Sequence, residues 1–144
     1  MIPLSFSEIS QRLKALDLPE VDLVLGIATG GIAPAVMVAH QLGCDLQLLQ
    51  LNYRDEANSP RFASPKYLSG LIPPSEPRLR ILLVDDVSVS GKTAIAAKAL
   101  LQGHNITTLV CKGRGDFVLF PEVSSCVRWP WKVAEQAPIK TEPS

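Results

Sequence analysis

One stretch of this chain, Ile81 to Ala94, limits its possible folds more than any other. It begins with four apolar residues, continues with the adjacent carboxylates Asp85 and Asp86, and ends in a hydroxyl-rich glycine turn. A short apolar run bounded by turn residues is typical of a strand that is buried on both faces of a sheet. We therefore expect a buried strand over Arg80 to Asp85, with the carboxylates at its carboxyl end.

The turn after this strand has the composition of an anion-binding site. It runs from Ser88 to Thr93 and leads into a helix that we expect to span Lys92 to Gln102. The free N–H groups and the dipole of a helix N-terminus, together with several hydroxyls, favour a bound anion. A phosphate monoester fits such a turn. The carboxylates before it suit the vicinal hydroxyls of a ribose and can neighbour Mg²⁺.

A triphosphate-binding loop is one alternative, because Gly91-Lys92-Thr93 matches the end of the G-x-x-x-x-G-K-[ST] motif. That motif needs a glycine at position 86, where this chain has Asp86. A carboxylate at that position would repel a triphosphate. A second alternative is an ordinary buried strand followed by a polar turn, which explains the apolar run but not the order of the polar residues.

Length, charge and cysteine content limit the number of domains and the kinds of partner that we expect. The chain has 144 residues, of which 47% are hydrophobic, and we expect one globular domain over 1–132 followed by a flexible, polar tail over 133–144. Fourteen basic and fourteen acidic side chains leave no net charge, so we expect neither a nucleic-acid nor a membrane partner. Three cysteines without C-x-x-C spacing argue against a disulfide framework and against a zinc site, and place the cysteines in the core.

The apolar runs and the first residues of the chain bear on where in the cell we expect the protein. No apolar run approaches the roughly 18 residues needed to cross a bilayer, and the first residues lack the basic-then-apolar pattern of a signal peptide. We therefore expect a cytoplasmic protein.

Strands and helices are expected to alternate along the chain. A helix follows the capping-box spacing of Ser5 and Glu8, a second helix spans Ile32 to Leu42, and the stretch from Tyr53 to Arg78, with five prolines, is expected to be a lid or binding loop. The expected strands are Val21–Ile27, Leu46–Asn52, Arg80–Asp85 and Ile106–Lys112. This order predicts an α/β fold with a mostly parallel sheet, helices on both faces, and ligands beyond the carboxyl ends of the strands.

The ordered run Asp85-Asp86-x-x-x-Ser90-Gly91-Lys92-Thr93 resembles the phosphoribosyl diphosphate (PRPP) motif of the type I phosphoribosyltransferases. The resemblance covers about residues 20–132 and implies their Rossmann-like fold, with a small hood formed by the C-terminal segment. It implies that Asp85 and Asp86 act on the ribose, near Mg²⁺ bound by the substrate. The residues that it assigns to PRPP and its 5′-phosphate are Val87, Ser88, Val89, Ser90, Gly91, Lys92 and Thr93.

Two further segments carry the same resemblance, most closely to the xanthine-guanine and hypoxanthine-guanine transferases of bacteria. Thr29, Gly30 and Gly31 lie where the family binds pyrophosphate, although the family usually has Arg or Lys at the position of Thr29. Lys112 ends an expected strand, as does the lysine that donates to the 6-oxygen of the purine in those relatives.

Val127-Arg128-Trp129-Pro130-Trp131 resembles the segment that builds their base pocket. This implies that Lys112, Trp129 and Trp131 bind the base. The alternatives are a solvated lysine and tryptophans that close the core.

The implied reaction transfers the ribose 5-phosphate of PRPP to a nitrogen base, expected to be a 6-oxopurine, and releases pyrophosphate with Mg²⁺ as cofactor. The expected partners are PRPP and a base or nucleoside monophosphate, and small domains of this family commonly form homo-oligomers. Val89 departs from the pattern, because relatives that act on 6-oxopurines usually have Asp there to handle a proton near N7 of the base. Two alternatives therefore stay open: a weakly catalytic, PRPP- or nucleotide-binding regulator on the same fold, and a transferase for a different base.

Overall fold

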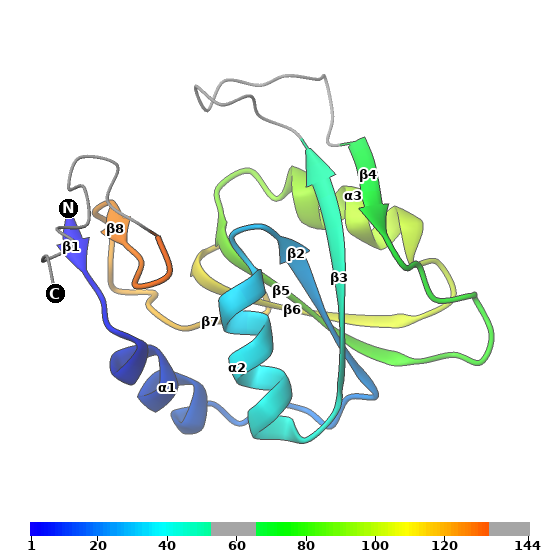
Figure 1. Cartoon of the computed structure of the whole chain (residues 1–144), viewed down its shortest axis with the longest axis horizontal. Helices are drawn as coiled ribbons and strands as arrows, with labels where there is room; N and C mark the ends of the chain where they lie inside the picture. The colour runs from blue at the N-terminus through cyan, green and yellow to red at the C-terminus, as the bar shows by residue number, and fades with distance from the viewer. Residues whose placement is uncertain (53–65, 133–144) are drawn as a thin grey trace, which may run out of the picture.

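The computed structural model describes residues 1–52 and 66–132. The helices are α1 (Phe6–Ala15), α2 (Ile32–Leu42) and α3 (Lys92–Leu100). The strands are β1 (Ile2–Pro3), β2 (Leu23–Ala28), β3 (Asp45–Asn52), β4 (Lys66–Gly70), β5 (Arg80–Ser88), β6 (Asn105–Gly113), β7 (Phe117–Val118) and β8 (Val127–Arg128). Six strands form one sheet in the order β4-β3-β2-β5-β6-β7, and β1 pairs with β8 apart from it (Figure 1).

The sheet is parallel except at one edge, where β4 runs antiparallel to β3. The central strands β2 and β5 lie side by side, with Leu25 opposite Leu83. From β2 the chain moves outward to β3, and from β5 it moves outward in the other direction to β6. The predicted α/β class with a mostly parallel sheet is confirmed.

Alternate residues of β5 explain why helices cover both faces of the sheet. Leu82 and Val84 pack into the apolar cluster that contains residues of α1 and α2. Ile81 and Leu83 pack into a second cluster, which contains Ala97 of α3. Because successive side chains of a strand point to opposite faces, an uninterrupted apolar run is what a strand between two helical layers requires.

The C-terminal segment is held against the N-terminal helix. The capping box predicted for Ser5 and Glu8 is present at the start of α1. Further along α1, the Arg12 guanidinium donates to the carbonyl oxygen of Leu119 at 2.8 Å and pairs with the Glu122 carboxylate. The short strands β1 and β8 add a second connection, which the sequence did not predict.

Two segments differ from the expectation. The stretch expected to be a loop over Tyr53 to Arg78 contains β4, an exposed edge strand whose neighbouring residues 53–65 lie outside the described part of the chain. Strand β5 continues to Ser88, three residues past Asp85, so the carboxylates lie within the strand rather than after it.

The cysteines differ from the expectation too, because only Cys111 is buried, whereas Cys44 is half-buried and Cys126 is exposed. Within residues 1–52 and 66–132, no helix is long and apolar enough to cross a membrane. The predicted tail, 133–144, falls outside the described residues.

Candidate active site

The two glycine turns singled out in the sequence lie at the carboxyl ends of the neighbouring strands β2 and β5. Strand β2 ends at Ala28 and is followed by the turn Thr29–Gly31, where α2 begins; β5 ends at Ser88, and α3 begins after Gly91. In sheets of this type, ligands bind in the crevice where the strand order reverses, outside the carboxyl ends of the strands. The fold therefore brings the predicted pyrophosphate turn and the predicted phosphate turn to one crevice.

Gly30 and Gly31 allow the turn after β2 to pack closely against Asp86 and the backbone of β5. A Cβ atom on Gly30 would lie 2.4 Å from Oδ2 of Asp86, and one on Gly31 would lie 2.5 Å from the carbonyl oxygen of Val84. Any larger residue would push the turn away from the end of β5. The two glycines are thus explained by packing between the turn and β5, in addition to the access to an anion that the sequence suggested.

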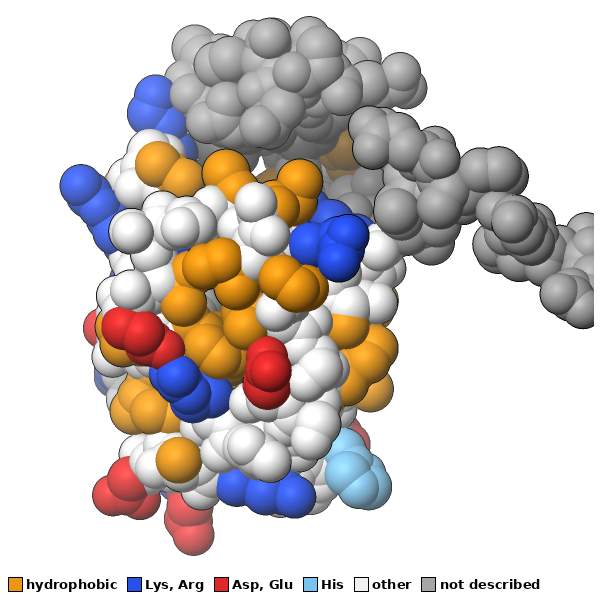
Figure 2. Space-filling view, turned by 90° about the vertical axis from the view of Figure 1, so that its left-hand side faces the viewer, with side chains coloured by type: hydrophobic (Ala, Val, Ile, Leu, Met, Phe, Trp, Pro, Cys, Tyr) orange, Lys and Arg blue, Asp and Glu red, His pale blue; other side chains and the backbone are white. Residues whose placement is uncertain are grey.

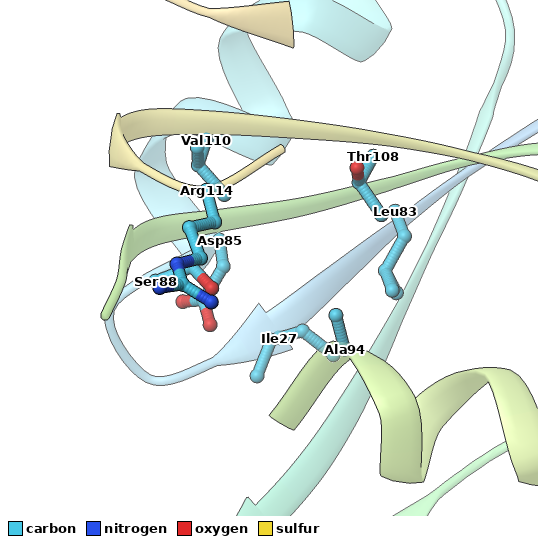
Figure 3. A pocket seen from close by; sticks show the side chains of 8 residues that line it. All are labelled: Ile27, Leu83, Asp85, Ser88, Ala94, Thr108, Val110 and Arg114. Carbon is cyan, nitrogen blue, oxygen red and sulfur yellow. The ribbon is translucent and has the colours of Figure 1, made fainter. Parts of the chain in front are cut away.

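Asp85 lies in a small pocket on the α3 side of the sheet (Figure 3), where the empty space, open solvent included, is about 270 Å³. Apolar residues of β2, β5, β6 and α3 line one part of it, and polar residues line the rest. The lining residues are Ile27, Leu83, Asp85, Ser88, Ala94, Thr108, Val110 and Arg114. Asp86, by contrast, lies against Gly30, so the adjacent carboxylates face different parts of the crevice.

Burial makes the charged form of Asp85 unfavourable. Desolvation, with a smaller contribution from the neighbouring Asp86 carboxylate, raises the pKa of Asp85 from 3.8 to about 8. Its Oδ1 atom accepts a hydrogen bond from the backbone N–H of Asp86 at 2.8 Å, which favours the ionised form but does not offset burial. A cation at this place would release the proton of Asp85.

The raised pKa predicts how stability depends on pH. Because folded Asp85 holds its proton up to about pH 8 while the unfolded chain loses it near pH 3.8, the native state binds the extra proton between these values. The free energy of unfolding should therefore fall as pH rises through this window, by up to about 1.4 kcal/mol per pH unit. Urea denaturation at several pH values measures this dependence of the free energy of unfolding on pH. Asp85→Asn should abolish this slope, and an unchanged slope would contradict the assignment.

The phosphate turn has the donors that the sequence predicted. Ser88 is buried at its start, and the Ser90 hydroxyl accepts a hydrogen bond from the backbone N–H of Lys92 at 3.3 Å. Gly91 adopts φ +81°, which favours glycine, and caps α3 without a side-chain hydrogen bond. Val89 is 74% exposed. The N-cap of α3 thus makes no side-chain hydrogen bond, although Ser90 accepts one from the N–H of Lys92, and the helix dipole at this N-terminus favours an anion.

Of the residues predicted to bind a base, Lys112 lies at the end of β6, whereas Trp129 and Trp131 lie in the C-terminal segment that forms the hood. The Lys112 ammonium donates to the carbonyl oxygens of Ser124 and Ser125, at 3.4 and 2.5 Å. Trp129 is 2% exposed and stacks on Trp131, with their ring centroids 5.2 Å apart. Buried Trp129 has no face to offer a base, so its geometry favours the packing alternative. Base contacts by Lys112 and Trp131 stay predictions.

Arg114 is a residue at this site that the sequence reasoning did not select. It belongs to the turn between β6 and β7 and lines the same pocket as Asp85 and Ser88. The signal was available, because Gly113-Arg114-Gly115-Asp116 directly follows a strand whose carboxyl end lies at the ligand edge of the sheet.

The acidic pair suits Mg²⁺ in its donor chemistry, because carboxylate oxygens are the ligands that this ion prefers. Within the described ranges, no three His, Cys, Asp or Glu side chains gather as a metal site. Asp85 and Asp86 would hold the ion together with oxygens of a substrate, as magnesium sites with bound phosphates commonly do.

These features define an α/β protein of the doubly wound class, with glycine turns after two neighbouring strands, β2 and β5, at its switch point. The sequence profile of the family described as phosphoribosyl transferase domain matches residues 8–129. The chain therefore belongs to the phosphoribosyl transferase domain family, and this membership identifies it as a transferase enzyme.

Solved structures share this fold at low sequence identity. A purine phosphoribosyltransferase from Pyrococcus horikoshii Ot3 has a TM-score of 0.77 and 20% identity, with 95% of this chain and 97% of that chain covered. A hypothetical protein from Neisseria gonorrhoeae with bound ppGpp has a TM-score of 0.70 and 21% identity, with 93% and 90% covered. The xanthine-guanine-hypoxanthine phosphoribosyltransferase of Helicobacter pylori has a TM-score of 0.67 and 15% identity, with 92% and 93% covered.

Proposed function

We propose that this protein transfers the ribose 5-phosphate of PRPP to a 6-oxopurine and releases pyrophosphate. The observation that carries the proposal is the contact between the Gly30 turn and Asp86 at the switch point of the sheet, beside the N-terminus of α3, whose N-cap Gly91 makes no side-chain hydrogen bond. A pyrophosphate site, a ribose site and a 5′-phosphate site would then follow one another along the crevice, in the order in which these groups occur in PRPP.

The residues of the crevice have separate parts in this reaction. The turn from Ser88 to Thr93 would hold the 5′-phosphate and fix the position of the ribose, which lowers the entropic cost of the reaction. Asp85 and Asp86 would accept hydrogen bonds from the ribose hydroxyls and stabilise the positive charge that develops at the anomeric carbon as pyrophosphate leaves. The turn Thr29–Gly31 would receive the leaving pyrophosphate.

Bound Mg²⁺ would neutralise part of the pyrophosphate charge. Asp85 and Asp86 would hold it through the substrate, and its charge would favour the ionised form of Asp85, whose pKa burial raises.

The choice of a 6-oxopurine rests on the hood. Lys112 lies at the end of β6, and an ammonium group with three donors has one left after its bonds to Ser124 and Ser125. Similarity of fold to the Helicobacter pylori enzyme, which is named for xanthine, guanine and hypoxanthine, supports the same choice. The direct test is pyrophosphate release from PRPP and Mg²⁺ with a panel of purines and pyrimidines. Turnover confined to another base would contradict the 6-oxopurine assignment.

Lys112→Met should weaken the use of 6-oxopurines selectively. A carbonyl group that loses its buried donor costs about 1–3 kcal/mol, so kcat/KM with guanine or hypoxanthine should fall about 10- to 100-fold relative to any activity with adenine. Lys98→Met is the matched control, because Lys98 is an exposed lysine on α3. Equal losses with oxo and amino purines would show that Lys112 only holds the hood in place.

A second candidate function is a nucleotide-binding regulator with little turnover. Two observations favour it: Val89, 74% exposed, occupies the position at which relatives have a proton-handling Asp, and Thr29 occupies that of a pyrophosphate-binding Arg or Lys. The similarity of fold to a protein solved with bound ppGpp is compatible with it. Tight binding of nucleotides without pyrophosphate release from any base of the panel would favour this candidate.

A further inference from the structure

Arg114 is held in a fixed turn at the rim of the pocket that contains Asp85. The Asp116 carboxylate accepts hydrogen bonds from the backbone N–H and the hydroxyl of Thr108, at 2.9 and 3.1 Å. The backbone N–H of Asp116 donates in return to the Thr108 hydroxyl at 2.8 Å. Because Thr108 is itself buried in the wall of the pocket, these bonds fix the Arg114 backbone relative to the pocket.

The same turn contacts the start of the phosphate turn. The backbone N–H of Arg114 donates to the carbonyl oxygen of Ser88 at 2.8 Å. Gly113 makes this approach possible, because a Cβ atom there would lie 2.0 Å from that oxygen. The Arg114 side chain extends from this point toward Asp85 and Ser88 (Figure 3). The guanidinium thus lies beside Asp85, at the start of the phosphate turn.

No hydrogen bond or ion pair within residues 1–52 and 66–132 engages the Arg114 guanidinium. Elsewhere in the described chain, Arg12 and Arg80 are both paired with carboxylates. Asp85 lines the same pocket as Arg114, but the two side chains form no ion pair. An arginine fork positioned at an anion-binding turn, with no protein partner, matches the geometry of a phosphate group.

We propose that Arg114 binds the 5′-phosphate of the ligand, opposite the N-terminal N–H groups of α3. This assignment rests on the proposed function, because it takes the turn from Ser88 to Thr93 as the 5′-phosphate site. It adds a cation from a turn outside the sequence motif and links the β6–β7 connection to ligand binding. It also gives a reason for the Thr108–Asp116 bonds, which keep this cation in place.

The test is calorimetric binding of ribose 5-phosphate, and separately of pyrophosphate with Mg²⁺, to the wild type and to three variants. Arg114→Met should weaken ribose 5-phosphate binding about 10- to 100-fold, as expected for the loss of a charge-assisted bidentate contact, and should change pyrophosphate binding less than twofold. Arg114→Lys should lose less affinity for ribose 5-phosphate, because it keeps the positive charge but not the two parallel N–H donors of the guanidinium. Arg78→Met, at the other end of β5, is the matched control and should bind as the wild type does.

The outcomes separate this assignment from the proposed function. Unchanged binding of ribose 5-phosphate by folded Arg114→Met would overturn the role of Arg114 and leave the proposed function in place. A loss that appears with pyrophosphate, and not with ribose 5-phosphate, would overturn it as well, because the arginine would then serve the leaving group. If the wild type binds neither ribose 5-phosphate nor PRPP, the proposed function fails and this assignment fails with it.

Discussion

Replacing both carboxylates, Asp85→Asn with Asp86→Asn, should lower kcat/KM for nucleotide formation about 10³-fold. The amides keep the size of the side chains but remove their negative charge. In our proposal that charge stabilises the positive charge at the anomeric carbon and lies near Mg²⁺. Removing one well-placed group that stabilises transition-state charge costs about 10²- to 10³-fold in other enzymes. Steady-state measurement of pyrophosphate release gives the value.

The same variant should still bind ribose 5-phosphate within a few-fold of the wild type. The phosphate donors lie in the turn after Ser88, whereas Asp86 contacts Gly30 and Asp85 lies in the pocket beneath that turn. The amide oxygens of the two Asn residues can still accept hydrogen bonds from the ribose hydroxyls, whereas the stabilisation of positive charge at the anomeric carbon exists only in the transition state and is lost. A loss of ribose 5-phosphate binding as large as the loss of turnover would place the carboxylates in the wrong role.

The main sheet was predictable because its core strands are short apolar runs with helical patterns between them. The ends of α2 match the prediction, since Gly31 precedes it and Gly43, at φ +66°, stops it. The edge strand β4 was not predictable from hydrophobicity. Tyr67 and Leu68 are both exposed, so neither face shows the burial that produces an alternating pattern. Its pairing with β3 depends on backbone hydrogen bonds, which leave no mark in the sequence.

The site was predictable to the extent that its residues are contiguous in the chain. The phosphate turn and the acidic pair form one run, and both glycine turns lie at strand ends, as the pattern indicated. Arg114 reaches the same pocket from the turn after β6, and only the register of β5 with β6, which pairs Ser88 with Gly113, places it beside Ser88. Trp129 could not be assigned, because an aromatic residue near a chain end reads the same whether it packs on Phe120 or on a ligand.

The C-terminal segment packs against α1 on one face of the molecule (Figure 2). This packing explains why the role of the C-terminal segment was difficult to predict from the sequence. Apolar and charged side chains are mixed there, and the Arg12 guanidinium lies 4.7 Å from the centre of the Phe120 ring while it pairs with Glu122. These contacts join residues that are more than a hundred positions apart in the sequence. No local pattern encodes them.

Val89→Asp should raise turnover with guanine, hypoxanthine or xanthine by about 10²- to 10⁴-fold, the range open to general acid–base catalysis. It adds the carboxylate that related 6-oxopurine transferases use near N7 of the base. Val89 is 74% exposed, so the new charge needs no burial and the fold should lose little stability. Pyrophosphate release with each base measures the gain.

Ile95→Asp is the matched control, because Ile95 is also an exposed apolar residue, 67% exposed on α3, and the same charge there should give no gain. The effect of Val89→Asp should vanish when Asp85 and Asp86 are both replaced by Asn, because proton transfer to the base has no use if the ribose cation is not stabilised. If Val89→Asp binds PRPP as the wild type does and still gains nothing with any 6-oxopurine, proton handling does not limit this site. That result would favour the regulator, or a transferase whose base needs no proton moved at N7.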